Sequence, residues 1–351
     1  MSKQRQYTLV SLILLVVLGL GGYFWRDDSP APTPALKHSY AKAVAMAHNG
    51  QPGAARVLYQ QLQRTDLSPI RRADLYAELP NYPSPLALKL ASQDLRHEDP
   101  LVRRAAVASM QALLPDAQRS LALAPLLEDE DHSVRFAVVD ALLELSPDDI
   151  GLYFGPLQHT LEQYQQALAQ QTEDPAAQLH LAQLYLHENN FKDASAALER
   201  TLQLAPDNLQ ALAVKVQLLE RQGQTDASRQ ILANALQLQP DSAFLQHELG
   251  RWLLRHGQDE YALLAFARAL ELEPDNNEYR YTLATSLHQL EQVEPAQKQL
   301  EALLSRDPAN RKARVLLIAY WKETGQMQNV QVLLAQLEQL NPDDPLVQQG
   351  L

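Results

Sequence analysis

The fold is decided by residues 243–276, which read AFLQHELGRWLLRHGQDEYALLAFARALELEPDN. Apolar side chains recur with helical spacing on both sides of Gly257, which predicts two helices joined by a turn where glycine accepts a positive φ. The small residues Gly250 and Ala262 let the two helices approach closely. Pro274 has no amide hydrogen and therefore ends the second helix. One hairpin of this size cannot bury its apolar face alone, so further hairpins must stack on it.

The same pattern recurs every 34 residues through the second half of the chain. Proline occupies the equivalent position in five successive units, and glycine occupies the turn position in three of them. These residues are Pro206, Pro240, Pro274, Pro308 and Pro342, with Gly223, Gly257 and Gly325. A fixed period of this length is typical of a stacked helical array, or solenoid.

These units resemble tetratricopeptide repeats (TPRs), whose length they share. The resemblance implies a superhelix of hairpins with a concave surface. Lys215 stands where the family has a large apolar residue, and Glu291 replaces the turn glycine. Residues 157–171 read as the second helix of a degenerate unit, and we place the TPR domain at 152–351. Its five regular units are 175–208, 209–242, 243–276, 277–310 and 311–344.

A second period, of 32 residues, precedes the TPRs. It is carried by Ile70-Arg71-Arg72-Ala73, Val102-Arg103-Arg104-Ala105 and Val134-Arg135-Phe136-Ala137. The last two sequences follow Asp99 and Asp131, whose carboxylates we expect to cap helix N-termini. The pattern is similar to HEAT repeats and predicts first helices at 54–65, 85–97 and 116–127. We therefore expect a HEAT-like block over residues 38–151.

The N-terminal segment predicts a membrane anchor. Residues 7–25 carry no charge, and a helix of these 19 residues, at ~1.5 Å each, just spans a hydrocarbon layer of ~30 Å. Tyr23 and Trp25 lie at its far end, where aromatic rings favour the membrane interface. A cleaved signal peptide is the alternative, but no small-residue cleavage site follows the apolar core.

Basic residues predict the orientation of this anchor. Lys3 and Arg5 lie in the short segment 1–6, so the positive-inside rule places that segment in the cytoplasm. The prediction is a single-pass protein of a bacterial inner membrane, in contact with the lipid bilayer through residues 7–25, with the bulk of the chain in the periplasm. Residues 26–37 are rich in proline and predict an extended spacer.

Composition argues against several classes of function. The formal charge of −12 disfavours nucleic-acid binding. The chain has no cysteine, which removes disulfides, thiolate zinc sites and c-type haem attachment. The ten histidines lack the spacing of a helical zinc site, and no nucleotide-binding motif or catalytic constellation is present. We therefore predict no enzyme activity, no metal and no cofactor.

The concave side of the TPRs is predicted to bind a protein or peptide. In the TPR resemblance, fixed positions of each first helix line that surface. They are Gln183, His187, Gln217, Arg221, Phe244, His247, Arg251, Arg255, Tyr281, His288, Lys312 and Lys322. Their arginines and lysines, in a chain that is acidic overall, indicate a cationic groove for an acidic segment or a peptide carboxylate. Alternatively, these are ordinary exposed charges balanced by Glu220, Glu278 and Glu323.

The order of anchor, spacer, HEAT-like block and TPRs resembles the repeat region of certain bacterial multihaem c-type cytochromes. Residues 172–182 and 274–281 carry this likeness, but the haem motifs are absent. We predict an all-α solenoid, HEAT-like and then TPR, with one N-terminal transmembrane helix. Its expected role is a non-catalytic scaffold in an envelope complex, with respiration implied by the resemblance. Two alternatives stay open: a periplasmic assembly chaperone for apocytochromes or other clients, and an enzyme with a degenerate site.

Overall fold

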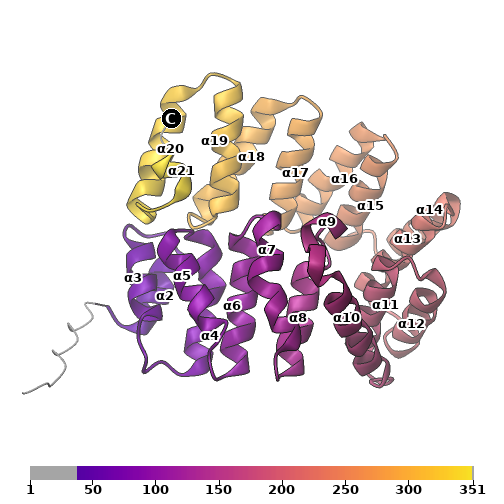
Figure 1. Ribbon diagram of the computed structural model, residues 1–351. Helices are drawn as coiled ribbons and strands as arrows, with labels where there is room; N and C mark the ends of the chain where they lie inside the picture. The colour runs from indigo at the N-terminus through magenta and orange to yellow at the C-terminus, as the bar shows by residue number, and fades with distance from the viewer. Residues whose placement is uncertain (1–37, 350–351) are drawn as a thin grey trace, which may run out of the picture. The chain divides into compact units, whose positions relative to one another are not determined.

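Helical hairpins follow one another along the computed structural model, which describes residues 38–349 (Figure 1). Within this range every regular element is a helix, as the sequence predicts. The predicted anchor at 7–25 and the spacer at 26–37 lie outside the described residues. Tyr40–Leu351 form one compact unit, so the predicted border between the HEAT-like block and the TPRs falls inside a single helical body.

The first part of this body is built from short helices. The predicted caps are present, because Asp99 and Asp131 each accept a hydrogen bond of 2.8 Å from the backbone N–H two residues further on. Ser68 precedes the third helix and makes no such side-chain bond. In order the elements are α2 (Tyr40–His48), α3 (Ala54–Leu62), α4 (Pro69–Glu78), η1 (Leu79–Asn81), α5 (Pro85–Asp94), α6 (Pro100–Leu113), α7 (Asp116–Leu123), η2 (Ala124–Glu128), α8 (His132–Leu142), α9 (Pro147–Ile150) and η3 (Gly151–Tyr153).

The second part consists of longer and more regular hairpins. A Cβ atom on Gly250 would lie 2.6 Å from the Phe266 ring, which explains why this position has no side chain. The elements are α10 (Phe154–Ala169), α11 (Pro175–His187), α12 (Phe191–Leu204), α13 (Leu209–Arg221), α14 (Thr225–Leu238), α15 (Ala243–Arg255), α16 (Asp259–Leu272), α17 (Asn277–Gln289), α18 (Val293–Arg306), α19 (Arg311–Glu323), α20 (Met327–Leu340) and α21 (Pro345–Gln348).

Four of the five repeating prolines also contact the next helix. The carbonyl oxygen of each accepts a hydrogen bond from the side chain six residues further on, in the first turn of that helix. The donor and acceptor pairs are Gln246 with Pro240, Arg280 with Pro274, Arg314 with Pro308, and Gln348 with Pro342. The proline thus ends one hairpin and orients the next, which helps to keep the 34-residue register.

The helices on either side of the predicted border between the two blocks pack against one another. Helix α10 packs against both α8 and α11. Phe136 on α8 stacks on Tyr164 of α10, with ring centroids 4.1 Å apart. His180 of α11 lies 5.1 Å from the Tyr164 ring and makes a 3.3 Å contact with Asp140 of α8. The solenoid therefore continues through the border between the blocks.

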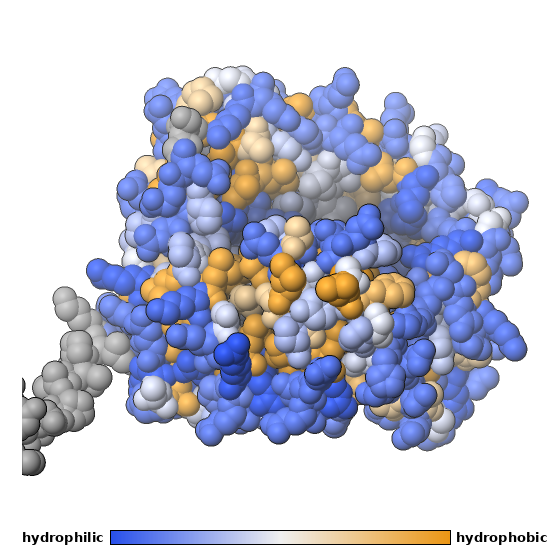
Figure 2. Space-filling view, viewed as in Figure 1, coloured by the Kyte–Doolittle hydropathy of each residue, from blue (hydrophilic) through white to orange (hydrophobic). Residues whose placement is uncertain are grey.

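The helical body closes on itself. Figure 1 shows α2–α8 in one row and α15–α20 in a second row, with α10–α14 joining the two at one end. The surface between the rows is hollowed, and apolar side chains gather over part of the first row (Figure 2). At the other end, the loops of the first row meet the last hairpin. We call this region the end contact; it is formed by Gly50, Gly53, Pro83, Pro308, Gln339 and Asn341.

Candidate peptide-binding surface

Three guanidinium groups lie around one pocket between α13 and α15, the first helices of successive repeats. The pocket has a volume of about 450 Å³. Equivalent positions of stacked repeats face the same side, so Arg221 and Arg255, which are 34 residues apart, line a common space. We call it the cationic pocket; its walls are Gln217, Glu220, Arg221, Arg251, Arg255 and His256.

Two of these arginines are oriented by the preceding repeat. Arg221 Nη1 donates to the carbonyl oxygen of Leu186 at 2.7 Å, and Arg255 Nη2 donates to Glu220 Oε2 at 2.7 Å. His256 Nε2 lies 2.9 Å from the other oxygen of Glu220. A guanidinium has five N–H donors, so these contacts position the side chains and leave further donors for a ligand.

The third arginine, Arg251, is oriented by a buried carboxylate on its own helix. Its Nη1 donates to Glu248 Oε1 at 3.1 Å, and His247 Nδ1 lies 3.6 Å from the same oxygen. Burial by itself raises the pKa of the Glu248 carboxyl, but the hydrogen bond from His247 and the charge of Arg251 outweigh burial. The pKa of Glu248 therefore lies below its ordinary value, and the group is ionised at neutral pH.

Internal carboxylates balance part of the positive charge. Glu220 pairs with Arg255, and Glu248 pairs with Arg251. Of the acids expected from the sequence to balance the arginines, Glu220 pairs with one of them, whereas Glu248 was not among those expected. Arg221 is bonded to a backbone carbonyl instead of a carboxylate, so the pocket retains an excess of positive charge.

A second group of the predicted residues lies on α17 and α19. Lys312 Nζ stands 4.4 Å above the centre of the Tyr281 ring. His288 stacks in parallel on Tyr320 at 3.7 Å, and its Nε2 lies 2.6 Å from a Glu323 oxygen. Burial raises the pKa of Tyr320 to about 12, so its hydroxyl stays neutral under ordinary conditions. These residues do not line the cationic pocket.

Two predicted residues lie elsewhere. His247 is only 5% exposed, so its expected place on the open surface is wrong. Its ring packs between Phe266 and Tyr279, and its Nε2 lies 3.3 Å from Thr282 Oγ1, which satisfies a polar atom inside the core. Phe244 is half-buried and lines a separate pocket at the loop between α14 and α15.

The remaining predicted residues are exposed but separate from the pocket. Gln183 and His187 lie on α11, and Lys322 lies on α19. None of the three lines the cationic pocket. The twelve predicted residues thus fall into several local groups, of which the pocket group brings together the most arginines.

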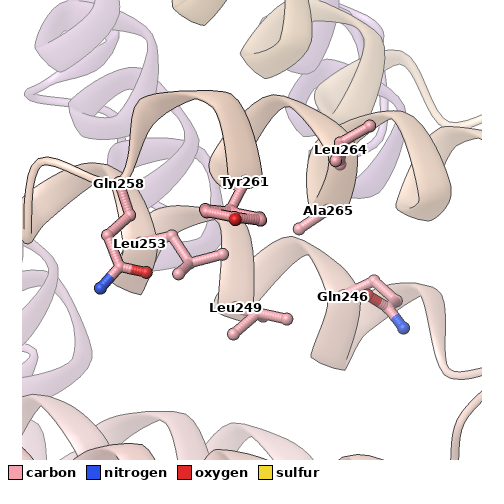
Figure 3. A pocket seen from close by; sticks show the side chains of 7 residues that line it. All are labelled: Gln246, Leu249, Leu253, Gln258, Tyr261, Leu264 and Ala265. Carbon is pink, nitrogen blue, oxygen red and sulfur yellow. The ribbon is translucent and has the colours of Figure 1, made fainter.

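An apolar pocket on α15 and α16 was not predicted (Figure 3). Leu249 and Leu253 face Tyr261 and Ala265 across it, with Leu264 at the rim. The sequence does hold a signal. Tyr261 and Leu264 are 65% and 68% exposed, and the equivalent residues of the preceding TPRs are polar or alanine.

The described residues offer neither a metal site nor a membrane-spanning helix. Across residues 38–349, no three histidine, aspartate or glutamate side chains are grouped so that they could hold a metal ion. In the same range, no helix combines the length and the apolar character needed to cross a bilayer.

The sequence matches a family model for the tetratricopeptide repeat at residues 157–218 and again at 188–252. TPRs are therefore present in this stretch, which begins in α10, where the sequence predicts a degenerate unit. No curated protein matches the chain.

Several solved structures, two of them described as TPR proteins, resemble the chain at low sequence identity. YrrB, whose structure is described as a TPR protein with an unusual peptide-binding site, is 20% identical, with 54% of this chain and 97% of that chain covered and a TM-score of 0.36. Yeast Tom70 is 14% identical over 90% of this chain and 65% of its own, with a TM-score of 0.48. TTC0263 of Thermus thermophilus is 21% identical over 58% and 98%, with a TM-score of 0.40.

Proposed function

We propose that the chain is a non-catalytic repeat scaffold that binds an acidic segment of a partner protein in the cationic pocket. The proposal is carried by the convergence of Arg221, Arg251 and Arg255 on one pocket in a chain of net charge −12. Guanidinium groups bind carboxylates through paired, charge-assisted hydrogen bonds, which are stronger than bonds between neutral groups. The TPR match at residues 157–252 supports a role in protein interaction, because part of the pocket lies in that stretch.

A charge-reversal experiment tests this function. Fluorescein-labelled oligoglutamate is titrated with the helical body from Lys37 onward, and binding is followed by fluorescence anisotropy. The double variant Arg251→Glu with Arg255→Glu is expected to bind at least about tenfold more weakly, because a hydrogen bond to a charged group contributes roughly 1.5–3 kcal/mol. Binding by the unchanged protein should also weaken as salt is raised.

The matched control makes the same charge change on second helices. Arg229 and Arg268 lie on α14 and α16, outside the cationic pocket, and their side chains are well exposed. The variant Arg229→Glu with Arg268→Glu is expected to retain most of the binding. Equal loss in both double variants would show that oligoglutamate responds to net charge alone, and would contradict the assignment of the pocket.

The setting of the scaffold is part of the same proposal. Residues 7–25 anchor it in a bacterial inner membrane, and the helical body lies in the periplasm, where it serves an envelope complex. Support comes from the uncharged 19-residue stretch and from Lys3 and Arg5 ahead of it. Alkaline phosphatase fused after Leu351 should be active in a Gram-negative host. An inactive fusion, with activity from a cytoplasmic reporter at the same place, would reverse the orientation.

A further inference from the structure

The buried apolar side chains of the helical body form two separate clusters. The first runs from α2 to α13, and the second runs from α13 to α20. Two helices among the described residues supply both clusters. Helix α13 gives Leu218 to the first cluster and Val216 to the second, while α20 gives Leu340 to the first and Leu333 to the second. The two halves of the core thus share one helix beside the cationic pocket and one helix at the end contact.

Packing is loose where α13 and α14 meet α15. Leu238, at the end of α14, is 83% exposed, whereas the equivalent Leu204 and Leu272 are half-buried and Leu340 is buried. Leu249 on α15 is only half-buried, although Leu181, Leu283 and Leu317 at the same position of other repeats are buried. Two pockets, the cationic pocket and the one lined by Phe244, lie along this junction.

The reason for the loose packing lies in the helix ahead of the junction. In a stacked array the second helix of one repeat covers the first helix of the next. Here the first turn of α14 contacts the last turn of α15, where Trp252 Nε1 donates to Ser228 Oγ at 2.9 Å. The exposed Leu238 shows that the far end of α14 does not make the matching contact. Helix α14 is thus packed through Ser228 and Leu232, and its C-terminal end is left in solvent.

The end contact, by contrast, is closely fitted. A Cβ atom on Gly50 would lie 2.6 Å from the carbonyl carbon of Pro308, so only glycine fits there. The Gly53 N–H donates to the Gln339 carbonyl oxygen at 2.7 Å.

Two buried polar residues follow α20. Asn341 is 0% exposed, and its Nδ2 donates to the Pro83 carbonyl oxygen at 2.7 Å. Asp344 is also fully buried and pairs with Arg311 at 2.6 Å. The Asn341 amide N–H thus pairs across two distant parts of the chain, while its Oδ1 is buried without a partner and the Arg311–Asp344 pair fixes the last hairpin itself. Because an N–H group buried without a partner is costly, separation of the two parts is disfavoured unless water replaces the Pro83 carbonyl.

We propose that the end contact is a latch and that the α13–α15 junction is the hinge opposite it. With the latch closed, α13 and α15 hold Arg221, Arg251 and Arg255 around a single pocket. Release of the latch lets the two halves turn about the hinge, which moves the two walls of the cationic pocket apart. A ligand that contacts both walls binds the closed body best and, by reciprocity, strengthens the latch. The ligand part of this inference rests on the proposed function.

The test measures closure and binding in the same variants. The chain has no cysteine, so spin labels on Gln60→Cys in α3 and Ala335→Cys in α20 report only the distance between the two rows. Both positions are exposed and lie outside the end contact. The latch is opened in two ways: Gly50→Ala, which places a methyl group against Pro308, and Asn341→Leu, which removes the bond to Pro83.

Both variants are expected to lengthen and broaden the distance between the labels. They should also weaken oligoglutamate binding at least about fivefold, the lower end of usual coupling between sites. Adding oligoglutamate to the unchanged body should narrow the distribution. The control is Gly325→Ala, where φ is +72° but a Cβ atom meets nothing, so backbone strain occurs without a clash. It should change neither readout.

Each failure has a separate meaning. Unchanged distances in both latch variants, with helical content intact by circular dichroism, would show that the end contact does not hold the body closed. Lengthened distances with unaltered binding would disprove the coupling. If Arg251→Glu with Arg255→Glu still binds oligoglutamate like the unchanged body, the proposed function fails, and the distances alone then decide whether the latch exists.

Discussion

Glu291 occupies a backbone conformation that suits glycine. Its φ is +61°, and the residues at the same turn of the other TPRs also have positive φ. Three of those residues are Gly223, Gly257 and Gly325, and the fourth is Asn189. A left-handed conformation costs a residue with a side chain roughly 1–2 kcal/mol, and asparagine tolerates it better than glutamate. The 34-residue period therefore demands a conformation here that the side chain opposes.

Replacing Glu291 by glycine should raise the thermal stability. The side chain is exposed, so little contact is lost, and the relief of strain exceeds the extra freedom of glycine in the unfolded chain. We expect a net gain of about 0.5–1 kcal/mol, measured as a higher Tm by circular dichroism. Asn189→Gly is the matched comparison and should gain less. A lower Tm for Glu291→Gly would contradict the strain argument.

The buried carboxylate of Glu248 predicts a pH-dependent contribution. Its pKa in the folded chain lies below the ordinary value of 4.5, so the ionised group adds stability above pH 4.5. That contribution is lost as pH falls through the folded-state pKa. Glu248→Gln should therefore lower the Tm at pH 7, and the difference from the unchanged protein should shrink as the medium is acidified. A difference that stays constant with pH would refute this reading.

At the scale of the element, most helices follow from local sequence. The prolines, the turn glycines and the caps Asp99 and Asp131 act within a few residues, so their effects could be predicted from spacing alone. The convergence of Arg221 and Arg255 could be predicted for the same reason, since equivalent positions repeat. His247 could not, because whether a side chain faces the open side or the next helix depends on the neighbouring rings of Phe266 and Tyr279.

Helix α14 is expected to be the least protected helix of the regular TPRs. Its buried residues are Ser228, Leu232 and Ala235, while Leu238 is left in solvent. An unburied leucine forgoes about 1.5–3 kcal/mol, enough for at least about tenfold faster local opening. Hydrogen exchange followed by mass spectrometry should show peptides from α14 exchanging sooner than those from α12 and α16. Equal protection in the three helices would rule out a hinge at this place.

At the scale of the whole molecule, the end contact could not be predicted from the sequence repeats. Asn341 and Pro83 are 258 residues apart, and they are not equivalent positions of one repeating pattern. A repeating sequence pattern reflects the contacts that each hairpin makes with its neighbours. It holds no information about contacts between the first and last hairpins. The two clusters and their shared helices could be found only once the curvature of the array was known.

Closure of the array limits the number of repeats that this chain can contain. In an open solenoid a hairpin can be added or lost cheaply, because each unit touches only its neighbours. Here the last hairpin must reach the position where Pro308 contacts Gly50 and the end of α20 contacts Gly53 and Pro83. Duplication or deletion of a single 34-residue unit would carry a different turn to that place. The number of repeats is therefore constrained, because the last hairpin must still meet the first row at the end contact.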